Sequence, residues 1–126
     1  FDAHALEQAG LQAVTEPQHI LTCRRLVQGV TVDEAIIAYI EGIVWMTRQL
    51  PDLLLGASPR AAIALLQGAK ALAALDGRPY VIPDDVKALA APVLRHRLIV
   101  RPEAELGGIT TDVVIGRVLA SVPIPR

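Results

Sequence analysis

Residues 58 to 77 carry a full set of signals for one long helix. Ser58 suits the N-cap position, Pro59 suits the first helical position, and Gly77 suits the residue that stops a helix. Between them, apolar side chains recur at the spacing of one helical face: Ala62, Leu65, Leu66, Ala69, Leu72 and Ala73. Roughly 17 residues at about 1.5 Å each make a rod of about 26 Å. A rod of that length spans a small domain, so the other elements are expected to pack around it.

Two helices are predicted before this one. The first runs from Pro17 to about Gln28, because a proline is tolerated in a first turn and a glycine follows as a stop. The second is expected to be opened by Thr31, which has the spacing of a capping box with Glu34, and to run to about Arg48. Its apolar stripe consists of Ile36, Ile40, Ile43 and Val44.

Two more helices are predicted after it. Pro83 starts the first, and Asp84 and Asp85 follow at the end where the helix dipole favours negative charge. Pro92 is expected to break this helix, with another turn or two over residues 93–97. The last helix is capped by Thr110 or Thr111 and ended by two prolines, and its apolar face consists of Ile115, Val118, Leu119 and Val122.

The residue types indicate the fold class. Aromatic residues make up only 3% of a chain that is 52% apolar, so the core has to be built from Ala, Leu, Ile and Val. Such residues suit closely packed helices. The β-favouring segment 98–100 is predicted to pair with residues 80–82 as a tiny ribbon. We therefore expect an all-α fold, a small bundle of about five helices with at most that one ribbon.

Charge and hydropathy exclude some classes of function. A net charge of -1 argues against a sequence-independent nucleic-acid binder, which normally carries a basic excess. No apolar run reaches the roughly 18 residues of a membrane span, and no signal peptide opens the chain. The single cysteine, Cys23, has no partner for an internal disulfide. A cytoplasmic protein is the expectation.

No motif in the chain supports catalysis by the chain alone. The phosphate loop Gly-x-x-x-x-Gly-Lys-Ser/Thr and the dinucleotide pattern Gly-x-Gly-x-x-Gly are both absent. His4, His19 and His96 lack the spacing of metal ligands, so no metal site is predicted. The Asp84-Asp85 pair has no evident partner for acid–base chemistry.

Arg60 is the strongest candidate for a binding residue. If Ser58 is the cap, Arg60 is the second helical residue and lies at the positive end of the helix dipole. A cation there is unfavourable by about 0.3–1 kcal/mol, and such local conflicts are often functional. An arginine beside free backbone N–H groups makes a corner suited to phosphate. The alternative is a solvated arginine, or one paired with a nearby acid such as Asp52.

The densest basic cluster consists of Arg95, His96 and Arg97, with Arg101 nearby. It is a candidate for binding a neighbouring subunit's acidic surface or a phosphate, and Arg48 is a further interface candidate. The alternative is a solvated helix end, where cations complement the dipole. Trp45 follows the helical stripe and suits packing, or else an anchor at an interface.

Three strings of residues, taken in order, resemble the lid of MoxR-type AAA+ ATPases. The first is Gly56-Ala57-Ser58-Pro59-Arg60-Ala61, preceded by Thr47-Arg48. The second runs over residues 77–86, and the third over residues 94–98. The resemblance covers residues 30–126, which we expect to be the lid domain. Residues 1–29 resemble the segment, with a first helix, that joins the lid to an ATPase core.

The resemblance implies a role for Arg60. In similar ATPases the matching arginine is the second-sensor residue, which approaches the γ-phosphate of ATP, and Ser58 and Pro59 would position it. ATP and Mg²⁺ are then the implied cofactors of a full-length parent that hydrolyses ATP. The implied partners are its own AAA+ core, the neighbouring subunits of a ring, expected to be a hexamer, and client or von Willebrand factor A-type proteins remodelled in a chaperone-like way. The Walker motifs, first sensor and arginine finger are absent here and would precede Phe1.

A second interpretation is a stand-alone helical adaptor or winged-helix-like module that touches nucleic acid. It needs Arg95, His96, Arg97 and Arg101 on one continuous basic face. The lid interpretation instead needs Arg60 at a helix start that faces an open groove. The low net charge and the ordered strings favour the lid.

Overall fold

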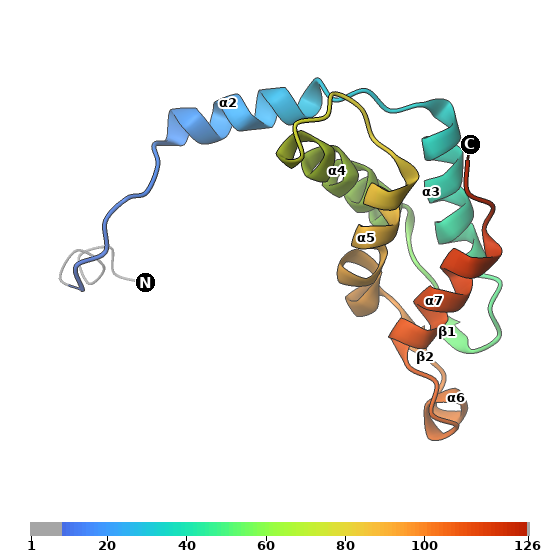
Figure 1. Ribbon diagram of the computed structural model, residues 1–126. Helices are drawn as coiled ribbons and strands as arrows, with labels where there is room; N and C mark the ends of the chain where they lie inside the picture. The colour runs from blue at the N-terminus through green and yellow to red at the C-terminus, as the bar shows by residue number, and fades with distance from the viewer. Residues whose placement is uncertain (1–8, 126) are drawn as a thin grey trace.

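Helices dominate the computed structural model, which describes residues 9 to 125 (Figure 1). Within those residues, six α-helices and one two-stranded sheet confirm the predicted all-α bundle, although the short α6 was not predicted. His4 lies outside the described residues. The elements, in chain order, are α2 (Pro17–Gln28), α3 (Glu34–Thr47), β1 (Leu53–Leu55), α4 (Pro59–Leu75), α5 (Pro83–Leu94), the 3₁₀ turn η1 (Arg95–Arg97), β2 (Ile99–Val100), α6 (Pro102–Leu106) and α7 (Thr111–Ser121).

The long helix α4 is central, and it packs against α2, α3 and α5 (Figure 1). Its buried face repeats every four residues and consists of Ala61, Leu65, Ala69 and Ala73. The predicted face is thus turned slightly, because Ala61 is buried where Ala62 is only half-buried. At Gly68 a Cβ atom would lie 3.0 Å from Leu89 Cδ1, so α4 and α5 approach closely there. None of the described helices is long and apolar enough to cross a membrane.

The start of α3 differs from the prediction. Asp33, and not Thr31, is the N-cap, and its Oδ1 accepts a hydrogen bond from the Ala35 N–H at 2.8 Å. The Thr31 backbone is held by the loop before α5, since its N–H donates to Pro79 O at 2.8 Å and its carbonyl accepts from Val81 N–H at 3.1 Å. This tertiary contact places Thr31 in an isolated β-bridge with Tyr80, two residues before the N-cap Asp33.

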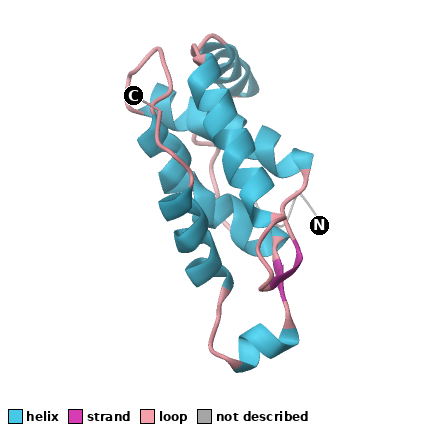
Figure 2. Ribbon diagram, turned by 90° about the vertical axis from the view of Figure 1, so that its right-hand side faces the viewer, coloured by secondary structure: helices cyan, strands magenta, loops and turns pink. Residues whose placement is uncertain are grey.

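Two predictions about the second half of the chain are wrong. Pro92 does not break α5, which continues to Leu94. Proline has no N–H to donate to the carbonyl of Ala88, four residues earlier. Pro92 and Ala88 are both exposed, so water is available to that carbonyl instead. The ribbon does form (Figure 2), but β2 pairs antiparallel with β1 rather than with residues 80–82. Leu53 lies opposite Val100. Tyr80 bridges to Thr31 instead.

The last helix is as predicted, with Thr110 as its N-cap. The residues after it turn back along α3 (Figure 1). Val122 packs over Gly42, where a Cβ atom would lie 3.1 Å from Val122 Cγ1. Pro125 lines a shallow hollow together with Asp33 and Pro83. The tail therefore reaches the N-terminal end of α3, opposite the end from which the chain continues towards α4.

Candidate functional site

The start of α4 presents Arg60 at the positive end of a helix. Ser58 occupies the N-cap and Pro59 the first helical position, as predicted, although the Ser58 hydroxyl makes no capping hydrogen bond. Arg60 is exposed, and among residues 9 to 125 no carboxylate lies within ion-pair distance of its guanidinium. The alternative partner Asp52 accepts instead from Arg117, at 2.8 Å. The guanidinium therefore faces solvent in a corner suited to an anion.

Thr47, the last residue of α3, anchors the loop that leads into α4. Its side chain is fully buried, and its Oγ1 donates to Val44 O at 2.7 Å. The same oxygen accepts a hydrogen bond from Ala57 N–H at 2.9 Å. A buried hydroxyl with both a donor and an acceptor partner is strongly specified, because loss of either leaves a buried polar group unsatisfied. The residue before Ser58 is thus fixed to the end of α3.

Arg48 and Gly56 complete this anchor. Arg48 Nε donates to Ala57 O at 2.8 Å, so both backbone polar groups of Ala57 are bonded to residues 47 and 48. At Gly56 a Cβ atom would lie 2.8 Å from Thr47 O and 2.9 Å from Arg48 Cα, which leaves no room for a side chain. Arg48, predicted as an interface residue, is engaged within the chain. In the sequence, the only signal of this anchor is the glycine at position 56.

An apolar hollow lies beside the candidate corner, between α3 and α4. One turn after Arg60, Ile63 has 54% of its surface exposed, and Ile37 on α3 has 42% exposed. Both are large aliphatic side chains that water touches directly. The hollow is lined by Ile37, Ile40, Glu41, Ala62, Ile63 and Leu66.

The predicted basic cluster is largely bonded within the chain. Arg95 Nε donates to Asp112 Oδ1 at 2.8 Å, and Arg101 Nε donates to Pro51 O at 2.9 Å. Arg97 Nε lies 3.2 Å from His96 Nε2, and no carboxylate among the described residues pairs with Arg97. The carboxylate of Asp112 therefore lies beside the basic cluster and pairs with one of its arginines.

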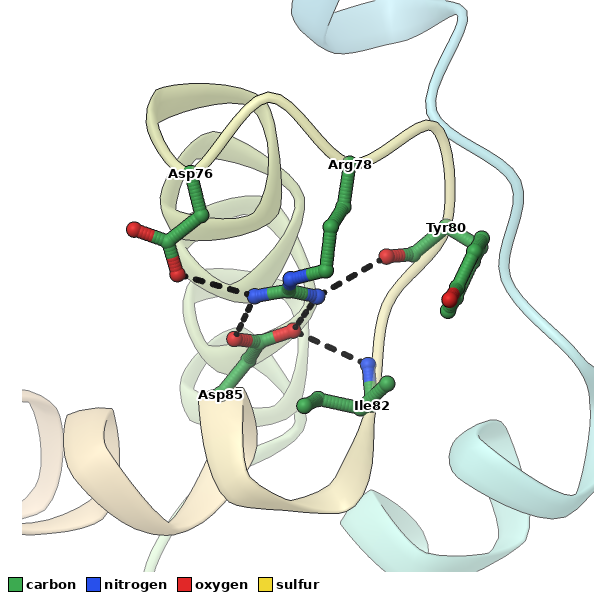
Figure 3. Close-up of polar contacts among 5 residues, drawn as sticks. All are labelled: Asp76, Arg78, Tyr80, Ile82 and Asp85. Atoms are coloured by element: carbon green, nitrogen blue, oxygen red, sulfur yellow. Dashed lines mark hydrogen bonds and ion pairs between the residues drawn. The ribbon is translucent and has the colours of Figure 1, made fainter.

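The loop between α4 and α5 contains an ion pair that sequence reasoning missed (Figure 3). The Arg78 guanidinium donates two hydrogen bonds to the buried Asp85 carboxylate, at 2.6 and 2.9 Å, and a third to Asp76 at 3.0 Å. It also donates to Tyr80 O at 3.1 Å. Asp85 in turn accepts from Ile82 N–H at 2.9 Å. We call these five residues the Arg78 clamp.

The Arg78 clamp controls the ionisation of Asp85. Burial alone would raise the pKa of the Asp85 carboxyl, but the hydrogen bonds from Arg78 and Ile82 N–H, with the charge of Arg78, outweigh it and lower the pKa. Attraction to the positive end of the helix dipole thus explains only part of the role of Asp84 and Asp85. The exposed Asp84 pairs with Lys87 at 2.9 Å, whereas Asp85 is a buried structural carboxylate.

Other candidate residues lie on the surface. Trp45 has 59% of its surface exposed, so the packing role suggested for it is wrong. Cys23 is exposed on α2. Across the described part of the chain, no three His, Cys, Asp or Glu side chains are grouped so as to hold a metal ion.

Comparison with known proteins gives consistent matches. A family model described as the AAA lid domain matches residues 46–117, which include the anchor, Arg60 and the Arg78 clamp. The uncharacterized protein YeaC of Bacillus subtilis is 40% identical over 98% of this chain, and Chaperone MoxR1 of Mycobacterium tuberculosis is 38% identical over 75% of it. This chain spans only 38% and 28% of the lengths of those two relatives.

A solved structure has a similar fold. It belongs to a candidate ATPase from Cytophaga hutchinsonii, and it superposes with a TM-score of 0.76 at 37% sequence identity. The match covers 81% of this chain and 34% of that protein.

Proposed function

The chain belongs to the AAA lid domain family, as the lid of a MoxR-like AAA+ ATPase, and on that premise we propose that Arg60 senses the γ-phosphate of ATP. The observation that carries the proposal is an exposed arginine without a carboxylate partner in the described chain, at a helix start fixed by Thr47 and Arg48. A guanidinium held in this way donates several hydrogen bonds to phosphate oxygens and is always charged.

The residues of this chain fit one part of an ATP site. Arg60 and the first turn of α4 supply a cationic corner for the phosphates. ATP supplies the phosphoryl group that is transferred, and the AAA+ core preceding this chain would supply the Walker residues and hold Mg²⁺. Arg60 binds and orients the outer phosphate, and it loses that contact when the phosphate leaves. Ser58 and Pro59 set the direction of the helix that carries it.

The anchor would convert this local contact into movement of the lid. Because Ala57 is bonded to the end of α3, a pull on Arg60 is transmitted to both α3 and α4 and not only to a flexible loop. Residues 30–126 would then tilt as the lid, and residues 1–29 would join it to the core. In a ring of such subunits, this tilt would drive chaperone-like remodelling of client or von Willebrand factor A-type proteins.

The test is ATP hydrolysis by the full-length ATPase that contains this chain. We expect Arg60→Ala to lower kcat by roughly 100-fold while circular dichroism and thermal unfolding stay as in the wild type, since such groups are typically worth about 10²–10³ in rate. Arg60→Lys should recover only part of the loss, because an ammonium lacks the two-pronged geometry of a guanidinium.

The matched control is Arg117→Ala. Arg117 is also an exposed arginine, but it pairs with Asp52 on the surface of the bundle. We expect this variant to keep wild-type turnover. If Arg60→Ala hydrolyses ATP as fast as Arg117→Ala, Arg60 is not the phosphate sensor, and the cluster at residues 95–101 becomes the first candidate for a binding site.

A further inference from the structure

Helix α2 is attached to the bundle by unusually few contacts. None of its residues is buried, and the apolar side chains of Ile20, Leu21 and Leu26 are exposed. It lies across the end of α4 and projects away from the other helices (Figure 1). With so little apolar surface buried, the direction of α2 depends on polar contacts at its C-terminal end.

Lys70 on α4 makes a side-chain hydrogen bond to that end. The last four carbonyls of a helix lack intrahelical partners. In α2, those of Arg25 and Leu26 accept from Gly29 N–H, and that of Val27 accepts from Val30 N–H. The fourth, Gln28 O, accepts a hydrogen bond from Lys70 Nζ at 2.7 Å, across 42 residues of sequence. A cation at this position also complements the helix dipole.

The chain just after α2 is held by a second element, the loop between α4 and α5. Thr31 exchanges backbone hydrogen bonds with Pro79 and Val81, and the loop that carries those residues is fixed by the Arg78 clamp (Figure 3). Residues 28–31, which join α2 to α3, are therefore hydrogen-bonded both to Lys70 of α4 and to the loop between α4 and α5.

Arg60 and α2 lie on the same side of α4. Gln67 and Ala71 follow Arg60 by seven and eleven residues, which is close to two and three full helical turns. These two residues line a hollow between α4 and α2, together with Ile20, Cys23, Arg24, Val27 and Gln28. Lys70 is ten residues from Arg60, or about 15 Å along one helix.

We propose that Lys70 is a positioning residue that couples Arg60 to α2. This inference rests on the proposed role of Arg60 as the phosphate sensor. One buried face fixes α4 in the bundle, so any tilt produced at Arg60 moves Lys70 with it. Through Gln28 O, Lys70 then sets the direction of α2, the helix that leads back to the core. Without the Lys70 ammonium, the junction at residues 28–31 keeps only the backbone bonds of Thr31, so α2 and the core would follow the lid less closely.

The experiment uses the full-length ATPase with Lys70→Met, which keeps the aliphatic stem, and Lys70→Arg, which keeps a cationic donor. Lys87→Met is the matched control, because among residues 9 to 125 the ion pair of Lys87 is with the exposed Asp84. Spin labels at Gln18→Cys on α2 and Gly116→Cys on α7, with other cysteines replaced, report the position of α2 by dipolar distance. Both sites are exposed, and a Cβ atom at Gly116 meets nothing within 4 Å.

We expect Lys70→Met to broaden the distance distribution and to lower kcat about fivefold to tenfold with KM within about twofold of wild type. Lys70→Arg should restore most of the turnover, and Lys87→Met should match the wild type. The inference is overturned if Lys70→Met keeps wild-type kcat while Arg60→Ala loses turnover, whether or not the distances broaden. If Arg60→Ala itself keeps full turnover, the proposed function fails and this inference falls with it.

Discussion

At the scale of single residues, Asp85 shows how one buried carboxylate organises a loop. It joins the start of α5 to Arg78 and so fixes the segment that holds Thr31. Its pKa is lower in the folded chain than the ordinary value of 3.8, because the hydrogen bonds to its charged form outweigh the effect of burial. The folded chain therefore binds fewer protons at this carboxyl than the unfolded chain does. Asp85 stabilises the fold above the unfolded-state pKa, and this contribution is lost as the pH falls through the lower, folded-state pKa.

We expect Asp85→Asn to lower the free energy of unfolding by about 2 kcal/mol near neutral pH. The difference from wild type should shrink progressively below about pH 4, where the carboxyl of the unfolded wild-type chain takes up its proton before that of the folded chain does. Urea unfolding of both chains across this pH range measures it. Asp84→Asn is the control, since its side chain is 78% exposed and surface pairs contribute little. A difference that stayed constant down to about pH 2 would contradict this role for the Asp85 charge.

Sequence reasoning reached Arg60 but not the residues that support it. The position of Arg60 followed from local rules, because a cap residue and a proline define where a helix starts. The roles of Thr47, Arg48 and Asp85 depend on contacts made after the helices pack. Spacing along the chain does not reveal that a threonine hydroxyl will meet a backbone N–H ten residues later.

At the scale of elements, the loop between α3 and α4 is fitted tightly to the end of α3. Gly56 is the tightest point, because the atoms that a Cβ would meet belong mainly to backbone and cannot move aside. Gly116 on α7 is the opposite case, with open space around it in a helix interior.

We expect Gly56→Ala to lower the free energy of unfolding by about 1–3 kcal/mol through overpacking. Gly116→Ala should raise it by about 0.5–1 kcal/mol, because alanine favours helix over glycine. Chemical denaturation of both variants and the wild type measures the two changes in the free energy of unfolding. Equal effects of the two substitutions would mean that the loop is not held against α3 as described.

The elements themselves were well predicted where local chemistry decides. The bounds of α2 and α4 and the Thr110 cap follow from proline, glycine and hydroxyl residues at helix ends. The partner of β2 was mispredicted, because Leu53–Leu55 is separated from it by two whole helices. Such a pairing depends on how α4 and α5 fold back, which the strand residues do not encode locally.

At the scale of the whole molecule, η1 carries a positive charge, that of Arg97, which no carboxylate of the described residues neutralises. Arg95 is neutralised by Asp112, but no carboxylate of the described chain pairs with Arg97. In the proposed ring, His96 and Arg97 would meet acidic groups of the neighbouring subunit. Such a contact supplies orientation and weakens with added salt.

We expect Arg97→Ala in the full-length ATPase to shift sedimentation towards smaller assemblies, most clearly at ionic strengths well below about 0.15 M, because added salt screens the same contact in the wild type. Arg117→Ala should assemble as the wild type does, because its ion pair lies within the chain. Identical sedimentation of all three proteins across salt concentrations would remove η1 from the subunit contact.

The course of the tail along α3 decides where a reporter group can be attached. Residues 122–125 run back towards the N-terminal end of α3, whereas Thr47 and the corner holding Arg60 lie at its C-terminal end. The 14 residues of α3 separate these two ends by about 21 Å. A fluorophore or affinity tag placed after Pro125 would thus stand clear of the corner where we propose that phosphate binds, and it would report on the lid without obstructing Arg60.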